Sequence, residues 1–216
     1  MPLLGEEMRW RTAFVVSLLA LLCDLGVGAR AESLCTPPTE IWAASTSTPR
    51  SSFDPQQATH WCWAATVANV FRSSGHVVSQ ARIVREVYGD AVNMRSGPAT
   101  NVAALLDRGW TDDAGGHFRA RLVGVYDAAS GRRDIRAREV VAALRAGRPL
   151  VVGTTSHAML LIGASYRVVG GEVTLVGATV FDPWPGVGVR ALRGNELVPV
   201  AEHGELAFIA DVAVSR

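Results

Sequence analysis

Apolar positions in the middle of the chain recur with the period of helices. The first such stretch follows Thr59, and its apolar residues share one face until Ser73-Ser74-Gly75 stops the pattern. Three further amphipathic stretches begin at Ser79, Thr100 and Asp134, which are residue types that often cap helix N-termini, and each ends at a glycine. The pattern therefore predicts four helices in this part of the chain.

After the fourth helix the period changes to that of β-strands. The predicted strands are Leu150–Gly153, His157–Tyr166, Val173–Phe181 and Leu206–Val212. Residues 158–163 carry no polar side chain, which is typical of a strand buried on both faces. Helices followed by strands predict an α+β fold, in which an N-terminal helical half packs on one side of a C-terminal antiparallel sheet.

Size and composition are those of one ordinary globular domain. The chain has 216 residues, of which 49% are hydrophobic and 19% charged. Twenty-one basic residues, all of them Arg, face 20 acidic ones, so no broad charged surface is expected for nucleic acid or an anionic membrane. The lack of Lys also excludes chemistry that needs a lysine amine.

The first 31 residues have the pattern of a secretory signal peptide. Two arginines precede the apolar run Ala13–Cys23, and Ala29-Arg30-Ala31 offers small residues for cleavage. An uncleaved anchor is the alternative, but Asp24 ends the run well short of a membrane span. We expect cleavage after Ala31, a secreted or periplasmic protein, and no stable membrane span after cleavage.

The remaining chain is expected to form one folded unit. Residues 32–52 are rich in Ser, Thr and Pro and predict an irregular N-terminal arm, and residues 53–216 form the predicted domain. Two cysteines, Cys35 and Cys62, would remain after cleavage. In an oxidising compartment a disulfide between them is one possibility that the sequence leaves open.

Cys62 is the first candidate for chemistry. With Thr59 as N-cap it falls in the first helical turn, where free backbone N–H groups and the helix dipole favour a thiolate. The alternative is a small buried apolar residue, as many free cysteines are. Gln56 or its neighbour Gln57 could supply a side-chain N–H that, with the backbone N–H of Cys62, forms an oxyanion hole.

His157 is the best candidate for a base among five histidines. The other four are His60, His76, His117 and His203; His60 points away from Cys62 on a helix, and the rest lie in loop-like contexts where we expect them to be solvated. His157 opens a buried strand. If residues 169–172 form a two-residue turn, the register sets His157 opposite residue 184 and Asp182 within diagonal reach. Asp182 could orient the imidazole, or simply form the turn before Pro183.

These residues together carry a family resemblance. Gln56 six residues before the cysteine, Trp61-Cys62-Trp63 opening a helix, His157 opening a strand and Asp182-Pro183 after the next strand resemble a papain-like cysteine peptidase. The likeness is closest to the compact bacterial branch with the bacteriocin-leader-processing peptidases and plant-pathogen effector proteases. It implies a papain-like fold, with Cys62 as nucleophile, His157 as general base, Asp182 as the residue that orients it and Gln56 as oxyanion donor.

The sequence departs from the larger papain relatives at three points. Trp61 replaces a small residue before the cysteine, which could change the shape of the cleft. The orienting residue is Asp182 rather than Asn, as in the compact branch. No long inhibitory prodomain precedes Cys62 in this sequence, so autoinhibition of that type is not expected.

Three functions remain open from the sequence. The leading one is a cysteine peptidase acting on a peptide or protein without any cofactor. The second is another thiol acyl-transfer enzyme, such as a cell-wall peptide amidase or a transglutaminase-like crosslinker, and the third is a non-enzymatic binding module on a degenerate peptidase fold. No metal is expected, because His60, Cys62 and the distant His157 lack zinc-site spacing.

Overall fold

The computed structural model describes residues 40–216. The predicted signal peptide, Cys35 and the first part of the predicted arm lie outside the described residues. The elements of the described chain are β1 Trp42–Ser45, the 3-10 turn η1 Arg50–Ser52, α3 Cys62–Ser73, α4 Gln80–Tyr88, α5 Ala99–Leu105, β2 Gly109–Thr111, β3 His117–Asp127, β4 Arg132–Arg133, α6 Ala137–Arg145, β5 Leu150–Thr154, β6 Ala158–Val169, β7 Glu172–Asp182, β8 Gly188–Ala191, α7 Gly194–Leu197, η2 Val200–Glu202 and β9 Leu206–Ser215.

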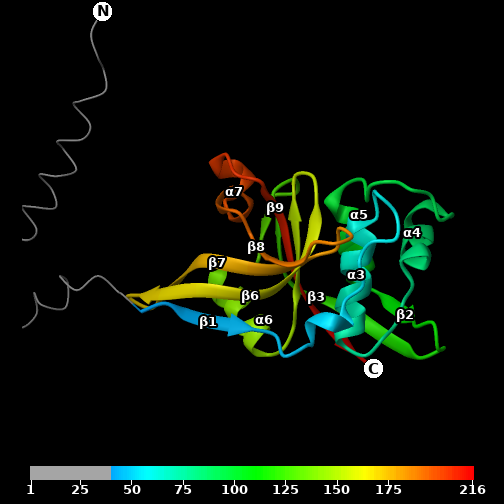
Figure 1. Ribbon diagram of the computed structural model, residues 1–216, viewed down its shortest axis with the longest axis horizontal. Coiled ribbons are helices and arrows are strands. Elements are labelled where there is room, and N and C mark those ends of the chain that lie inside the picture. The colour runs from blue at the N-terminus through cyan, green and yellow to red at the C-terminus, as the bar shows by residue number, and fades with distance from the viewer. Residues whose placement is uncertain (1–39) are drawn as a thin grey trace, which may run out of the picture. The chain divides into compact units, whose positions relative to one another are not determined.

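The described strands form one antiparallel sheet, and helices cover both of its faces. The main order is β2-β3-β9-β5-β6-β7-β8, with β1 on β6 and β4 on β3 (Figure 1). Helices and an antiparallel sheet agree with the α+β class. The predicted arrangement is wrong in two respects. Four strands, β1–β4, precede α6, whereas the prediction placed all strands after the last of these helices. In addition, α6 packs on the opposite face of the sheet from α3, α4 and α5.

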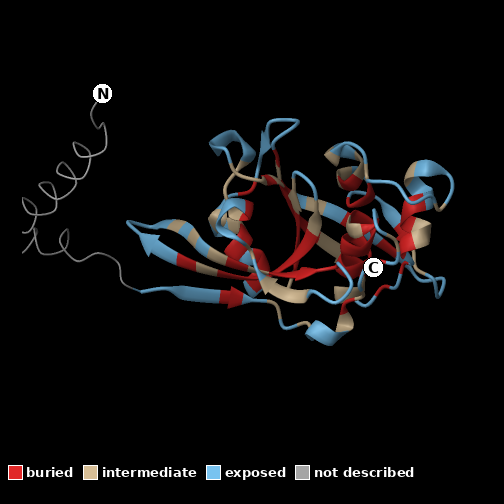
Figure 2. Ribbon diagram, turned by 45° about the horizontal axis from the view of Figure 1, so that its top comes forward, coloured by how far each residue is buried: buried red, intermediate tan, exposed pale blue. Residues whose placement is uncertain are grey.

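The burial pattern of β5 and β6 explains the second helical layer. Val151 and Leu160 belong to the core that contains α3–α5, whereas Leu150 and Leu161 belong to the core around α6. Neighbouring strand residues point to opposite faces, so a strand that is apolar throughout needs cover on both. Figure 2 shows the buried residues concentrated in this central region, with the distal end of the β6–β7 hairpin exposed.

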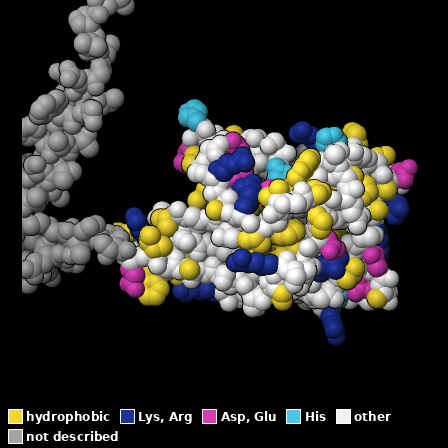
Figure 3. Space-filling model, in the orientation of Figure 1, with side chains coloured by type: hydrophobic (Ala, Val, Ile, Leu, Met, Phe, Trp, Pro, Cys, Tyr) yellow, Lys and Arg dark blue, Asp and Glu magenta, His cyan; other side chains and the backbone are white. Residues whose placement is uncertain are grey.

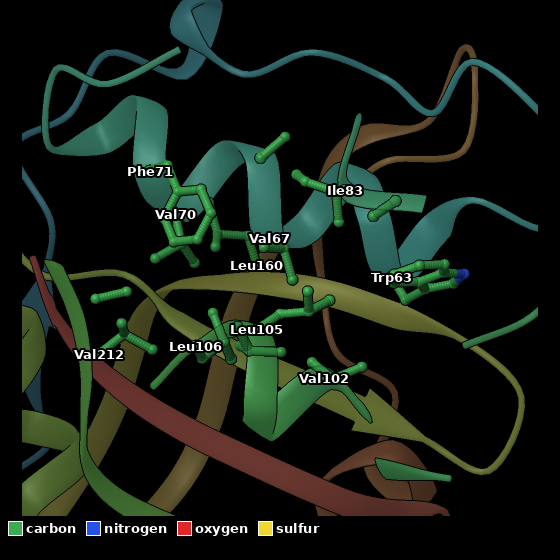
Figure 4. Packing of buried hydrophobic residues seen from close by; sticks show 14 of the residues in the cluster. Trp63, Val67, Val70, Phe71, Ile83, Val102, Leu105, Leu106, Leu160 and Val212 are labelled. Atoms are coloured by element: carbon green, nitrogen blue, oxygen red, sulfur yellow. The ribbon is translucent and has the colours of Figure 1, made fainter. Parts of the chain in front are cut away.

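Helix α3 is the central element of the first core. Its residues 63–71 are all buried, and Val67 and Val70 pack toward Leu160 of β6 (Figure 4). Replacing such a fully buried leucine by alanine costs about 2–5 kcal/mol in folded proteins. The start of α3, where Cys62 lies, is thus held rigidly against the sheet.

Three of the four predicted helix caps are wrong. Ser79 does precede α4, but α3 begins after Trp61, α5 after Pro98 and α6 after Arg136. Tertiary contacts and local charges account for the shifts at α3 and α6. The Thr59 hydroxyl accepts a hydrogen bond from Asn93, and the Asp134 carboxylate pairs with Arg132 instead of capping α6.

Strand β1 corrects the prediction for the N-terminal arm. Trp42–Ser45 pair antiparallel with residues 163–166 of β6, and Ala44 is buried. The arm is therefore not irregular over these four residues. A segment of four residues with a single buried position is a weak strand signal until its partner strand is known.

Candidate active site

Cys62 is the first residue of α3, so it occupies the first helical turn although Thr59 does not cap the helix. Its thiol lies beside His157 and the backbone N–H groups of Ala158 and Trp63. Burial, the largest effect, would raise the pKa of the thiol, but these neighbours favour the thiolate, outweigh burial and lower the pKa below its ordinary value. The site favours a thiolate.

His157 is placed by a tight turn between β5 and β6. Thr154 holds this turn: its hydroxyl oxygen accepts the His157 backbone N–H at 3.1 Å, and its own N–H donates to the His157 carbonyl at 2.8 Å. The imidazole is 22% exposed, so it faces the surface of the site without being freely solvated. Because Nε2 contacts Asp182, Nδ1 is the ring nitrogen left for Cys62.

Asp182 at the end of β7 completes a chain of three groups. His157 Nε2 lies 2.6 Å from Asp182 Oδ1, and the same oxygen accepts the Trp184 backbone N–H at 2.9 Å. Burial of His157 would lower its pKa, but Asp182 and Cys62 outweigh this and raise it to about 9. Burial of Asp182 would raise its pKa, but His157, the Trp184 N–H and Arg190 hold it at about 2.

The predicted register between β6 and β7 holds because two irregularities cancel. Val169 pairs with Glu172 as expected, and Gly170 and Gly171 both take positive φ in the turn. One bulge shifts the register between Ser165 and Tyr166, and a second between residues 161 and 163 shifts it back. Asp182 therefore meets His157 where the unbulged count placed it.

Two charged residues that the sequence did not indicate, Arg190 and Glu196, support Asp182 on the side away from His157. Arg190 of β8 donates from Nε to Asp182 Oδ2 at 2.9 Å, and its two terminal nitrogens bind Glu196 of α7 at 2.7 and 2.8 Å. Both carboxylates are buried. The Glu196 carboxylate raises the pKa of Arg190 above its ordinary value. Burial of the guanidinium would lower this pKa, but Asp182 raises it further. Nothing in the spacing of these residues signals their contact, because it depends on how β8 and α7 pack beside β7.

Gln56 lies beside the site but its amide is occupied. Its Nε2 donates to the carbonyls of Ala58 and Thr59 at 2.9 and 3.0 Å, and its backbone N–H donates to Pro183 at 2.7 Å. Its buried Oε1 has no partner in the described chain. The amide thus braces the turn before α3, and the oxyanion role stays a prediction. Gln57 is exposed, with its backbone N–H bonded to Gln80.

Cys62 and His157 line a cleft of about 630 Å³, and the buried Asp182 lies outside this lining. Its lining comprises Thr59, His60, Cys62, Trp63, Arg95, Ser96, Gly97, Ala99, Val102, Val151, Gly153, Thr154, Thr155, Ser156, His157, Ala158, Trp184, Ala207 and Phe208. The segment Tyr88–Ala99 contributes Arg95, Ser96, Gly97 and Ala99 to this lining. Trp184 is exposed in the lining, whereas Trp61 and Trp63 are buried.

Other histidines do not join the chain of three groups. His60 lines the cleft, and His117 and His203 are exposed. His76 corrects a prediction: it is buried, its Nδ1 lies 2.9 Å from Asp112, and its ring stacks on Phe118 at 4.2 Å between centroids. A neighbouring carboxylate and an aromatic ring make burial of this histidine possible.

Within residues 40–216 no group of three or more His, Cys, Asp or Glu side chains is arranged to hold a metal ion. The helices of this part of the chain are also too short or too polar to cross a membrane. Basic and acidic side chains are interspersed on the face in Figure 3, in keeping with the balanced charge of the chain.

Comparison with known proteins gives a partial likeness among solved structures. No family model and no curated protein sequence matches the chain. Among solved structures, the chain is similar to the peptidase domain of Streptococcus ComA, described as a bi-functional ABC transporter involved in a quorum sensing pathway. The TM-score is 0.41 and the identity 15%, over 75% of this chain and 96% of that one. A likeness at this level does not define a family, so the functional conclusion depends on the geometry of Cys62, His157 and Asp182.

Proposed function

We propose that the protein is a papain-like cysteine peptidase that hydrolyses peptide bonds of a peptide or protein substrate through Cys62, His157 and Asp182. The observation that carries the proposal is that Cys62 and His157 lie together in the lining of a substrate-sized cleft, with the Asp182 carboxylate 2.6 Å from His157 Nε2 behind them. A cysteine with a merely structural role has no need of a base that is itself oriented by a carboxylate.

The geometry supports acyl transfer in two steps. The Cys62 thiolate attacks the carbonyl carbon of the scissile bond, and the carbonyl oxygen becomes an oxyanion. The His157 imidazolium then gives its proton to the leaving amine as the C–N bond breaks, which leaves a thioester on Cys62. In the second step His157 takes a proton from water, the hydroxide attacks the thioester, and Cys62 departs as thiolate.

Asp182 keeps the imidazole in place during both steps. Its carboxylate accepts the Nε2–H, so Nδ1 faces Cys62, and its charge stabilises the imidazolium. The backbone N–H of Cys62 is free of an intrahelical partner because Cys62 begins α3, and it is our candidate for one oxyanion donor. Gln56 would become the second donor only if its amide left the carbonyls of Ala58 and Thr59.

The first test is alkylation of the full chain with iodoacetamide at mildly acidic pH, followed by peptide mapping. Mapping separates Cys62 from Cys23 and Cys35. We expect rapid labelling at Cys62 that slows strongly in His157→Ala, because the thiolate loses its partner. Labelling of Cys62 no faster than that of an unfolded cysteine would contradict the proposal and favour a binding module.

A second test distinguishes hydrolysis from other acyl transfers. Unfolded protein substrates are incubated with the protein in ¹⁸O-labelled water, with Cys62→Ser as the control, and products are analysed by mass spectrometry. A peptidase yields new C-termini that contain the label. Crosslinked or amine-modified products without labelled termini would instead identify a transglutaminase-like enzyme.

We further propose that the chain reaches a secreted or periplasmic location through residues 1–31, with cleavage after Ala31. The proposal depends on the sequence pattern alone. N-terminal sequencing of the protein recovered outside the cytoplasm tests it, and an N-terminus at Met1 would contradict it.

A further inference from the structure

The loop of residues 89–98, called the cleft loop below, is fastened to both sides of the candidate nucleophile. The indole N–H of Trp61 donates to the Val92 carbonyl at 2.9 Å, and that of Trp63 donates to the Met94 carbonyl at 3.1 Å. These two tryptophans flank Cys62 in the chain, and both are buried. The loop therefore cannot move far without breaking contacts to the start of α3.

Side chains of the loop and of α4 add to this attachment. Asn93 accepts the His60 backbone N–H at 2.9 Å and donates to the Thr59 hydroxyl at 2.8 Å. The Tyr88 hydroxyl donates to the carbonyl of Arg95. The backbone of Arg95 is thus held at a defined place relative to the thiol.

Arg95 is an unpaired cation in a cleft without carboxylates. It lines the cleft, it is exposed, and it takes part in no salt bridge within residues 40–216. None of the described residues that line the cleft is Asp or Glu. The other groups there that can carry positive charge are His60 and His157, and His157 is already engaged by Asp182 and Cys62.

Apart from Cys62, the rest of the lining offers no competing anion for a guanidinium, since its polar side chains are the hydroxyls of serines and threonines and the two histidines. Val102, Val151 and Phe208 are apolar and buried. A peptide that covers the cleft would exclude water from it, which strengthens an ion pair between the substrate and Arg95. Guanidinium and carboxylate groups match in a bidentate geometry, so a carboxylate is the ligand group that this cleft favours.

We propose that Arg95 binds a carboxylate of the peptide substrate near the scissile bond, supplied either by an Asp or Glu side chain or by a free C-terminus. The inference rests on the proposed peptidase function for the nature of the ligand as a peptide. It names a specificity-determining residue that takes no part in the bond-breaking steps.

The test measures peptide binding and needs no cleavage. Full-chain protein carrying Cys62→Ala is immobilised and offered mixtures of short peptides of randomised uncharged residues. In one arm the peptides are amidated and a single position is Asp, Asn or Arg; in the other arm uncharged peptides carry a free or an amidated C-terminus. Retention is quantified by mass spectrometry at low and at physiological salt.

We expect Asp peptides, free C-termini or both to be retained roughly fivefold to tenfold better than their neutral counterparts, more so at low salt. This preference should disappear in the double variant Cys62→Ala, Arg95→Gln. In Cys62→Ala, Arg95→Glu the Arg peptides should instead be the ones retained best. Arg85→Glu is the matched control, because Arg85 is exposed on α4 and lies outside the cleft lining. It should leave the preference unchanged.

The outcomes separate this inference from the proposed function. A preference for carboxylates that is absent, or that survives Arg95→Glu, overturns the inference. Peptides that bind through Arg95 but are not cleaved by the wild-type protein would contradict the peptidase and leave the carboxylate site standing. Cleavage without any preference for carboxylates would leave the peptidase standing and remove the role of Arg95.

Discussion

Replacing Asp182 by Asn keeps the shape of the side chain and removes its charge. The carboxylate accepts three hydrogen bonds: from His157 Nε2 and the Trp184 N–H on Oδ1, and from Arg190 Nε on Oδ2. An asparagine has only one acceptor oxygen. If that oxygen stays with His157, the new NH₂ group faces the donor of Arg190.

The expected effect on His157 follows from its position between two anions. Its pKa is raised from 6.5 to about 9, against burial, by Asp182 and by Cys62. Without the Asp182 charge we expect the pKa to fall by at least about one unit, which corresponds to about 1.4 kcal/mol of lost stabilisation of the imidazolium. Because the imidazolium exists only below its pKa, the pH range in which His157 can protonate a leaving amine shrinks from the alkaline side.

The assay is NMR titration of ¹³C-labelled histidine side chains through the neutral and alkaline range. The His157 signal is assigned by its absence from a His157→Gln variant. The wild-type signal should titrate near 9 and the Asp182→Asn signal at least about one unit lower. A His157 pKa that is unchanged in Asp182→Asn would refute the reasoning, because Asp182 would then not stabilise the imidazolium.

Asp127→Asn is the matched control for this experiment. Asp127 is also a buried aspartate, but it lies in β3 and accepts hydrogen bonds from the Ala129 N–H and the Ser130 hydroxyl, away from the cleft. Its replacement should lower the free energy of unfolding and leave the His157 titration unchanged. The comparison separates a loss of charge at the site from a general loss of stability.

Four further predictions concern the support of the site. Arg190→Gln removes the guanidinium that pairs with the buried carboxylates of Asp182 and Glu196, so the free energy of unfolding in urea should fall by about 1–3 kcal/mol; an unchanged value would contradict these buried pairs. Lowering the pH from about 4 towards 2 protonates Asp182, whose pKa in the folded protein is about 2, and should lower the free energy of unfolding by about 2 kcal/mol. The Asp182→Asn variant already lacks this contribution, so its stability should fall less over the same range. Thermal melting of both proteins at each pH checks the difference. Gln56→Ala should lower stability with little change in kcat if the amide only braces the turn before α3, whereas a fall in kcat of about a hundredfold would show the oxyanion role. Trp61→Phe removes the bond to Val92, so hydrogen exchange in residues 89–98 should accelerate while exchange in β6 stays unchanged.

Local patterns in the sequence were sufficient for much of the candidate site. The apolar face of α3 and the turn at residues 169–172 are local features, and they place Cys62 at a helix start and Asp182 within reach of His157. The predicted register between β6 and β7 is correct only because two bulges cancel, and no local signal in the sequence indicates either of them. A single bulge would have moved Asp182 one position along β7.

Local residue patterns were enough to predict the helix that carries Cys62, the strand pair that joins His157 to Asp182, and the mixed helix and sheet composition. These depend on the periodicity and turn preferences of neighbouring residues. Four features depend on long-range packing: the pairing of β3 with β9, the second helical layer, the hydrogen bonds that occupy the Gln56 amide, and the support of Asp182 by Arg190. Each of these contacts joins side chains or strands whose meeting is determined by the packing of the whole sheet, and periodicity within a segment holds no information about which distant segment it will meet.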